Sequence, residues 1–495
     1  MTLTLSRPDL LRHESFLNNE WVRSGRTFAV TNPATGEVLA DVPDCGEEEA
    51  RAAVDCAQRA YQAWRRVVAR DRAALLRRWH QRILDNQEDL ARLISLEQGK
   101  PLAESRGEVA YGASYVEWFA EEAKRAYGDV IPQQHNGRRL LTVREPVGVV
   151  AAITPWNFPM AMIARKIAPA IAAGCAVVAK PAEDTPLTSL ALVKLLQEAG
   201  APAGLVNMLT TSRARASVLA DVWLADSRVR KISFTGSTAV GKHLARESAP
   251  TLKKLSLELG GNAPFIVFDD ADLHAAVDGL MVAKFRNAGQ TCICPNRVYV
   301  QRGIHDAFVA ALSERVRQLK VGPASNAASQ IGPLINLRAL EKVQEHVADA
   351  VLQGASIAVG GKVFESQEAP GGHFYAPTVL TGVTAAMRMS CEETFGPVVP
   401  VTAFDGEQEA VALANDTPYG LAAYVYTRDI GRAWELGEAI EAGMVAVNDG
   451  VLSTEIAPFG GIKESGYGRE GSRYGLEEYM HIKYLCHGNL DRPRG

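Results

Sequence analysis

The chain has 495 residues, of which 47% are hydrophobic and 22% charged, and its formal net charge is -4. A chain of this length exceeds what one hydrophobic core serves, so two or three domains are expected. The slightly acidic balance disfavours nucleic acid as a partner, because binding a polyanion requires a basic surface.

The N-terminus and the cysteines indicate the compartment. Charged residues interrupt positions 1–16, which therefore lack the apolar core of a signal peptide. The longest apolar stretch, 167–179, is too short to cross a membrane and contains Pro169 and Gly174. The seven cysteines fit no disulfide framework, which favours free thiols in a reducing compartment. We expect a cytoplasmic protein with no membrane partner and no metal site, and a poorly packed segment before Phe16.

Helices are expected first along the chain, over residues 47–126, because Ala-rich helical spacing follows acidic N-terminal residues. From Val147 onward, short β-branched runs alternate with helical patterns. The expected strands are 147–153, 176–179, 206–209 and 231–235, and the expected helices are 160–173, 189–199, 213–220 and 239–248. Such alternation predicts a parallel, doubly wound sheet.

A second alternating series predicts a second α/β domain. Its expected strands are 263–268, 297–301, 398–404, 422–427 and 444–448. Two further strand-like segments, 130–145 and 478–485, fit neither series and lie at the margins of the chain. Exposed strands of this kind are usually paired, and we expect these to pair with another subunit.

Two loops contain candidate catalytic side chains. Cys292 follows Gly289, Gln290 and Thr291 in a polar loop, as a nucleophile would, although most cysteines are small core residues. Glu258 closes an apolar, strand-like run at 255–259. A glutamate in such a place is either salt-bridged or tuned for proton transfer, and neither residue is decisive alone.

Three further loops follow expected strands, at the edge where doubly wound sheets bind ligands. PWNFP at 155–159 could also be a plain structural turn. FTGST at 234–238 lacks the Gly-x-Gly-x-x-Gly pattern, but a phosphate could bind at the helix N-terminus near Ser237. Lys180 and Glu183 could hold the hydroxyls of a ribose.

Together, seven stretches resemble the aldehyde dehydrogenase superfamily, from about Phe16 to Gly488: PWNFP, KPAE, FTGST, ELGG, GQTC, EETFGPV and PFGGIKESGYGREG. The resemblance implies an α/β fold with two doubly wound parallel-sheet domains plus a small β oligomerisation arm. It implies a cofactor-binding domain at 1–128 and 147–258, a catalytic domain at 259–465, and an arm and tail at 129–146 and 466–495. An arm of this kind implies a homodimer or homotetramer.

The resemblance also implies a mechanism. Cys292 matches the nucleophile that attacks an aldehyde as a thiolate, forms a thiohemiacetal and, after hydride transfer to the nicotinamide, carries a thioester. The Asn157 amide and the Cys292 backbone N–H match the groups that hold the oxyanion. Glu258 matches the general base that activates water for deacylation.

The cofactor implied by the resemblance is NAD, with NADP as the alternative. The matching residues are Thr154, Pro155, Trp156, Lys180, Glu183, Gly236, Ser237, Leu259, Glu393 and Phe395. Glu183 should repel a 2′-phosphate, whereas Arg213 or Arg215 would attract one if either reached it. Both arginines lie in the loop 210–215, where many family members have glycines. The sequence therefore does not decide how the adenine end of the cofactor is bound.

Within the superfamily the chain is most similar to succinate-semialdehyde dehydrogenases, through AMIARKIAPAIAAGC, KFRNAGQTCICPNR and PFGGIKESGYGREGSRYGLEEY. A substrate with a carboxylate tail requires a fixed cation, and Arg165 and Arg286 match that role, with Ser453 as a third contact. Three alternatives stay open. They are glutarate semialdehyde, one methylene longer; an uncharged aldehyde, with both arginines structural; and a non-catalytic protein that keeps the fold.

Cys294 suggests a regulatory alternative. In some members of the subfamily the two cysteines of a Cys-x-Cys pair join under oxidation and inactivate the enzyme. So tight a ring requires a flexible backbone, and Pro295 stiffens it here. A redox switch between Cys292 and Cys294 and a reduced packing cysteine are both kept as hypotheses.

Overall fold

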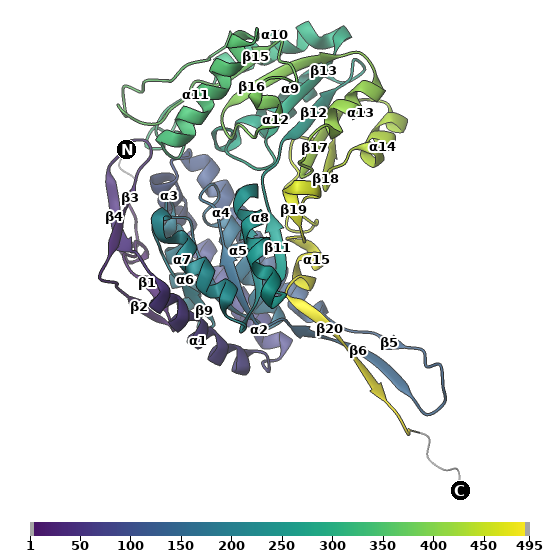
Figure 1. Cartoon of the computed structure of the whole chain (residues 1–495). Helices are drawn as coiled ribbons and strands as arrows, with labels where there is room; N and C mark the ends of the chain where they lie inside the picture. Colours follow the sequence, from purple (N-terminus) through teal and green to yellow (C-terminus); the bar gives the residue numbers. More distant parts are fainter. Residues whose placement is uncertain (1–3, 491–495) are drawn as a thin grey trace.

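The computed structural model describes residues 4–490. Two layered bodies, each built around a sheet, stack on one another, and a narrow β arm projects from the lower one (Figure 1). Each sheet has its own large hydrophobic core. Within the described part of the chain, no helix is both long enough and apolar enough to cross a membrane.

The expected helical region forms four helices. They are α1 (Glu47–Trp64), α2 (Ala69–Asp85), α3 (Gln87–Glu97) and α4 (Leu102–Glu122). Each buries an apolar stripe, as helical spacing requires. Helix α4 packs against α2, α3 and α5 (Ala161–Ala173), and so lies directly behind the loop that precedes α5.

The first sheet has the strand order β19-β11-β10-β7-β8-β9-β1-β2. Its parallel centre consists of β7 (Val149–Ile153), β8 (Ala176–Lys180), β9 (Val206–Met208), β10 (Val229–Thr235) and β11 (Lys254–Glu258). The crossover helices are α5, α6 (Pro186–Glu198), α7 (Ala216–Ala225) and α8 (Thr238–Ser248). This confirms the predicted parallel alternation. Every residue of β7 and β8 is buried, as expected for strands covered on both faces.

The N-terminal segment is where the sequence prediction was wrong. Strand β1 (Ser15–Leu17) pairs with β2 (Glu20–Val22) and with β9, so it extends the first sheet in the antiparallel sense. A separate hairpin joins β3 (Thr27–Thr31) and β4 (Val38–Pro43). Among the described residues before Phe16, Leu10 is fully buried in the first core and Arg7 forms an ion pair with Glu198 at 2.7 Å, so this part of the segment packs against the first body.

The second sheet has the order β14-β15-β16-β13-β12-β17-β18. Its strands are β12 (Ala263–Val267), β13 (Pro295–Gln301), β14 (Ser356–Val359), β15 (Thr378–Thr381), β16 (Val398–Phe404), β17 (Ala422–Tyr426) and β18 (Met444–Val447). Only β14 is antiparallel to its neighbour. The helices of this body are α9 (Leu273–Phe285), α10 (His305–Arg317), α11 (Leu337–Leu352), α12 (Arg388–Cys391), α13 (Glu407–Asn415) and α14 (Ile430–Ala439).

The two marginal segments form one sheet, in which β6 (Arg139–Pro146) pairs with both β20 (Met480–His487) and β5 (Val130–Ile131). This sheet is the projecting arm of Figure 1. Of the described residues in the predicted arm and tail, 466–490, only β20 lies in this sheet. Strand β19 (Gly466–Tyr467) pairs with β11 in the first sheet, and α15 (Ser472–Glu477) packs on α4 and α5.

Candidate active site

A cavity of about 340 Å³ has walls from both sheets. Loops after β7, β10 and β11 of the first sheet contribute, together with the loop before β13 and the segment before β16 in the second body. The predicted residues that line this cavity are Pro155, Trp156, Asn157, Gly236, Ser237, Glu258, Leu259, Cys292, Glu393 and Phe395. The predicted nucleophile, base and oxyanion amide therefore surround a common space.

The loop that carries Cys292 has an unusual backbone. Asn287, Ala288 and Gly289 have φ values of 52°, 54° and 76°, and the first two adopt a conformation that costs free energy for a residue with a side chain. Gln290 holds this turn, since its side chain accepts from the Ile335 N–H at 3.0 Å and donates to the Pro333 carbonyl at 3.3 Å. The chain then delivers Cys292 to the cavity before β13 begins.

Burial raises the pKa of Cys292 to about 12, and the nearby charge of Arg165 opposes that shift. The sulfur is therefore a thiol at neutral pH in this state of the site. Because the thiolate is the nucleophile, a step of the reaction cycle must lower this pKa or remove the proton.

Asn157 lies after β7 and is 4% exposed. Its Nδ2 donates to the Gln290 carbonyl at 3.0 Å, which ties it to the nucleophile loop. An amide nitrogen has two hydrogens, so one N–H stays available for an oxyanion. Its Oδ1 is buried and has no hydrogen-bond partner within residues 4–490.

Glu258 ends β11, is 1% exposed, and neither carboxyl oxygen has a hydrogen-bond partner in the described chain. Burial raises the pKa of Glu258 well above its ordinary value, and the Glu470 carboxylate adds to this effect. The raised pKa means that Glu258 binds a proton more readily than an exposed glutamate does. A group in this condition is tuned for proton transfer, because a structural glutamate would be paired.

Seven of the ten predicted cofactor residues line the cavity. Ser237 is the N-cap of α8, and its Oγ accepts from the Val240 N–H at 3.4 Å. Trp156 meets Phe395 edge to face, with ring centroids 5.5 Å apart. Glu393 accepts from the Gly261 N–H at 3.3 Å, and burial raises the pKa of Glu393 to about 7. Side chains of both bodies thus meet across the cavity.

Helix α11 contributes residues that the sequence analysis missed. Arg338, Ala339 and Lys342 line the cavity, and the Lys342 Nζ donates to the Glu393 carbonyl at 2.6 Å. The available signal was a helix with basic residues four apart on one face, which is also common on solvent-exposed helices. Arg213 lines the cavity as well, whereas Arg215 is engaged with the Asp44 carbonyl at 2.7 Å.

Three predicted cofactor residues do not line this cavity: Thr154, Lys180 and Glu183. Thr154 is buried at the end of β7. The Lys180 Nζ pairs with Glu183 at 3.4 Å and donates to the Pro181 carbonyl at 3.1 Å. Their contact with a ribose stays a prediction.

The two predicted substrate arginines differ in their surroundings. Arg165 is fully buried and ion-paired through Nε with Glu470, but its two terminal nitrogens have no hydrogen-bond partner within residues 4–490. Although burial disfavours the charge, the Glu470 carboxylate holds the pKa of Arg165 above its ordinary value. Arg286 is half-buried over the Phe158 ring, 4.7 Å from its centroid.

Ser453 lies in the loop after β18 and is half-buried. The same loop is tied to α4, because the Tyr115 hydroxyl donates to the Thr454 carbonyl at 3.3 Å. The role of Ser453 in binding substrate stays a prediction.

All seven cysteines are free thiols, and Cys294 is buried, with its Sγ donating to the Lys284 carbonyl at 3.6 Å. The redox switch between Cys292 and Cys294 stays a hypothesis. Among residues 4–490, no group of His, Cys, Asp and Glu side chains is arranged to hold a metal ion.

Comparison with known proteins agrees with this site. The model of the aldehyde dehydrogenase family matches residues 21–485. The 3-sulfolactaldehyde dehydrogenase of Pseudomonas putida is 54% identical, over 99% of this chain and 100% of that protein. The NADP-dependent succinate-semialdehyde dehydrogenase GabD of Escherichia coli K12 is 52% identical, over 98% and 100%.

Among solved structures, the succinate-semialdehyde dehydrogenase of Burkholderia pseudomallei superposes with a TM-score of 0.95 at 52% identity, covering 98% of this chain and 99% of that one. The chain belongs to the aldehyde dehydrogenase family. It is an oxidoreductase of the NAD(P)-dependent kind, and its α/β fold is the predicted one.

Proposed function

We propose that this enzyme oxidises succinate semialdehyde to succinate through a thiohemiacetal and a thioester on Cys292. The observation that carries the substrate assignment is the state of the two arginines. No hydrogen bond or ion pair within residues 4–490 engages the Arg286 guanidinium, and the terminal nitrogens of Arg165 are also unpartnered. Buried or half-buried cations without full pairing are costly, and a carboxylate tail would pair them.

The residues act in sequence. Cys292 loses its thiol proton to solvent water and, as a thiolate, attacks the carbonyl carbon. The free N–H of Asn157 and the Cys292 backbone N–H stabilise the oxyanion. A nicotinamide cofactor held by Trp156, Ser237, Glu393 and Phe395 would supply the hydride acceptor that turns the thiohemiacetal into the thioester. Glu258 then takes a proton from the water that attacks the thioester, which releases the acid and restores the thiol.

The cavity suits an anionic dinucleotide. Arg213, Arg338 and Lys342 line it, and the backbone N–H groups at the N-terminus of α8 favour phosphate. We propose NAD as the preferred form, because Glu183 would repel a 2′-phosphate. Arg213 at the cavity wall supports NADP as the alternative.

Kinetics with a panel of aldehydes tests the substrate. Initial rates would be measured with succinate semialdehyde, glutarate semialdehyde, 3-sulfolactaldehyde and an uncharged aldehyde of matched length, each with NAD and NADP. We expect the highest kcat/KM for succinate semialdehyde with NAD. A larger value for glutarate semialdehyde would shift the assignment by one methylene, a change to which pockets respond only modestly.

Arg286→Ala tests the anion site directly. We expect kcat/KM for the semialdehyde to fall by about 100-fold, the scale of a lost charge-assisted pair, with less than about threefold change for the uncharged aldehyde. Arg302→Ala, which removes an exposed arginine paired with Asp405, is the matched control and should leave both values unchanged. Equal losses for both substrates in Arg286→Ala would mean that the arginine is structural.

We propose that the first body binds the cofactor, the second carries the nucleophile, and the arm joins subunits into a homodimer or homotetramer. Ile482, Tyr484 and Val130 of the arm are more than half exposed, which supports its burial in an assembly. Free thiols support a cytoplasmic location. Sedimentation of the enzyme as a stable monomer would overturn the oligomer assignment.

A further inference from the structure

A buried ion pair that takes no part in the proposed chemistry lies behind the Asn157 loop. Lys100 and Glu108 have side chains that are 1% and 0% exposed, and their Nζ and Oε2 atoms are 2.7 Å apart. Lys100 lies in the turn between α3 and α4, and Glu108 in the second turn of α4. Both side chains point toward the segment that links β7 to α5, as their contacts show.

Lys100 holds the main chain of Asn157 itself. Its Nζ donates to the Asn157 carbonyl at 2.7 Å and lies 4.0 Å from the centroid of the next side chain, Phe158. Burial lowers the pKa of Lys100, and the Glu108 carboxylate opposes that shift. The ammonium is thus bound by one anion and by the backbone of the predicted oxyanion residue.

Glu108 holds the far end of the same segment. Its Oε1 accepts from the N–H groups of Met160 and Ala161, at 2.9 and 3.3 Å. These groups lie at the N-terminus of α5, where helical N–H groups have no intrahelical partner and a carboxylate is favoured. The pair therefore fixes both ends of residues 157–161.

The Asn157 carbonyl also connects this segment to the nucleophile loop. It accepts a second hydrogen bond, from Asn287 Nδ2 at 3.0 Å. Asn287 is one of the residues with positive φ, and it is held by Gln98 Nε2 at 2.9 Å and by Glu104, which accepts from its N–H at 2.8 Å. One oxygen atom thus joins the support of the oxyanion amide to the support of Cys292.

A buried ion pair is a weak source of stability, because desolvation offsets most of the attraction. Its geometry is a better explanation for its presence. We propose that Lys100 and Glu108 are positioning residues that hold the Asn157 amide at the oxyanion site relative to Cys292. This inference rests on the proposed function, in which Asn157 stabilises the oxyanion.

The test is a double-mutant cycle in the full-length enzyme. The variant Lys100→Met with Glu108→Gln removes the ammonium but keeps an oxygen for the N–H groups of Met160 and Ala161, so no charge is left unpaired. We expect kcat to fall by about 10- to 100-fold, as for a misplaced catalytic group, with KM for the aldehyde and Kd for NAD within about threefold. The Tm of each variant would show that it is folded.

In an Asn157→Ala background the same pair of substitutions should have almost no further effect on kcat, because the group they position is gone. If the loss of kcat in the combined variant equalled the product of the two separate losses, the pair would not act through Asn157. An unchanged kcat in the wild-type background would also overturn the proposal. If Asn157→Ala alone left kcat unchanged, the proposed oxyanion role would fail first. The two failures are therefore distinguishable.

Glu97→Gln is the matched control. Glu97 is also a fully buried glutamate, and it accepts from the N–H groups of Leu187 and Thr188 at 2.7 and 2.8 Å, at the N-terminus of α6. Its hydrogen bonds go to α6 and not to the Asn157 segment. We expect its kcat to stay within about twofold of wild type, which would show that loss of a buried capping carboxylate alone does not slow the reaction.

Discussion

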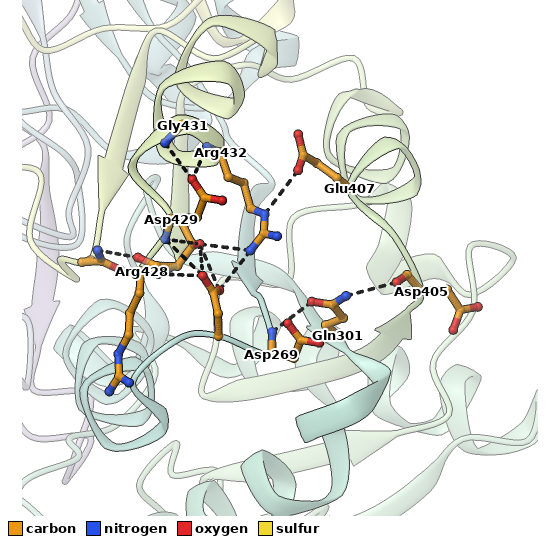
Figure 2. Close-up of polar contacts among 11 residues, drawn as sticks. Asp269, Gln301, Asp405, Glu407, Arg428, Asp429, Gly431 and Arg432 are labelled. Atoms are coloured by element: carbon orange, nitrogen blue, oxygen red, sulfur yellow. Dashed lines mark hydrogen bonds and ion pairs between the residues drawn. The ribbon is translucent and has the colours of Figure 1, made fainter.

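Polar groups near the two ends of the second sheet differ in how completely they are hydrogen-bonded. At the amino end of β13, the cavity that both bodies line contains buried polar atoms with no hydrogen-bond partner in residues 4–490: both oxygens of Glu258 and Oδ1 of Asn157. At the carboxyl end of β12, Asp270 is fully paired. It accepts from the Thr427 hydroxyl, from the N–H groups of Arg428 and Asp429, and from Arg432 (Figure 2).

Doubly wound sheets usually bind their ligands at the carboxyl ends of the strands. In the second sheet, that edge carries a network of paired polar side chains. Arg432 bridges Asp270 and Glu407, and Gln301 joins Asp269 to the Asp405 carbonyl (Figure 2). An unpaired buried polar group costs free energy, so its presence in the cavity indicates a functional role. Complete pairing of the polar groups around Asp270 indicates a structural role.

The largest expected effect that would sharpen this comparison is that of Glu258→Gln. The substitution keeps the shape but removes the base, so kcat should fall by about 10²- to 10⁴-fold. Acylation of Cys292 does not require this base, and we expect rapid-mixing experiments to show a burst of reduced cofactor equal to the enzyme concentration. Glu407→Gln in the paired cluster is the control and should leave kcat unchanged. Steady turnover at the wild-type rate in Glu258→Gln would contradict the comparison.

A second, smaller effect concerns the state of Cys292. With a pKa raised to about 12 by burial, the thiolate fraction in the cofactor-free enzyme should increase about tenfold per pH unit between pH 6 and 9. The iodoacetamide alkylation rate at this residue, followed by mass spectrometry, should rise accordingly and without a plateau. Exposed Cys391 of the same chain serves as the internal reference. A plateau near neutral pH for Cys292 would show a thiolate that is already formed.

The smallest effect on activity is expected in the paired cluster. Asp270→Ala removes the acceptor of several hydrogen bonds and leaves Arg432 with Glu407 and the Thr427 hydroxyl as its remaining partners, so we expect Tm to fall by about 2 to 5 °C. The kcat and KM of the folded enzyme should stay within about twofold of wild type. A large loss of kcat in Asp270→Ala without a change in Tm would contradict the structural role assigned to this cluster.

Much of the site could be predicted from local sequence because each key residue lies beside a strand. Asn157 follows β7, Glu258 ends β11 and Cys292 precedes β13, so the strand pattern already places them at sheet edges. Arg338 and Lys342 were missed because α11 is distant in sequence from every motif. The packing of the N-terminal segment was mispredicted, since the pairing of β1 with β9 joins residues far apart in the chain.

The sequence by itself singled out Cys292, Glu258 and Asn157, which line one cavity, and the alternation that specifies two parallel sheets, because loop motifs and hydrophobic periodicity are local properties. Only the tertiary structure decided which charges are paired. It joins Arg165 to Glu470, leaves Glu258 unpaired, and places Lys100 under the Asn157 carbonyl. These outcomes depend on burial and on contacts between distant segments, and burial sets both the cost of a charge and the pKa of the group that carries it.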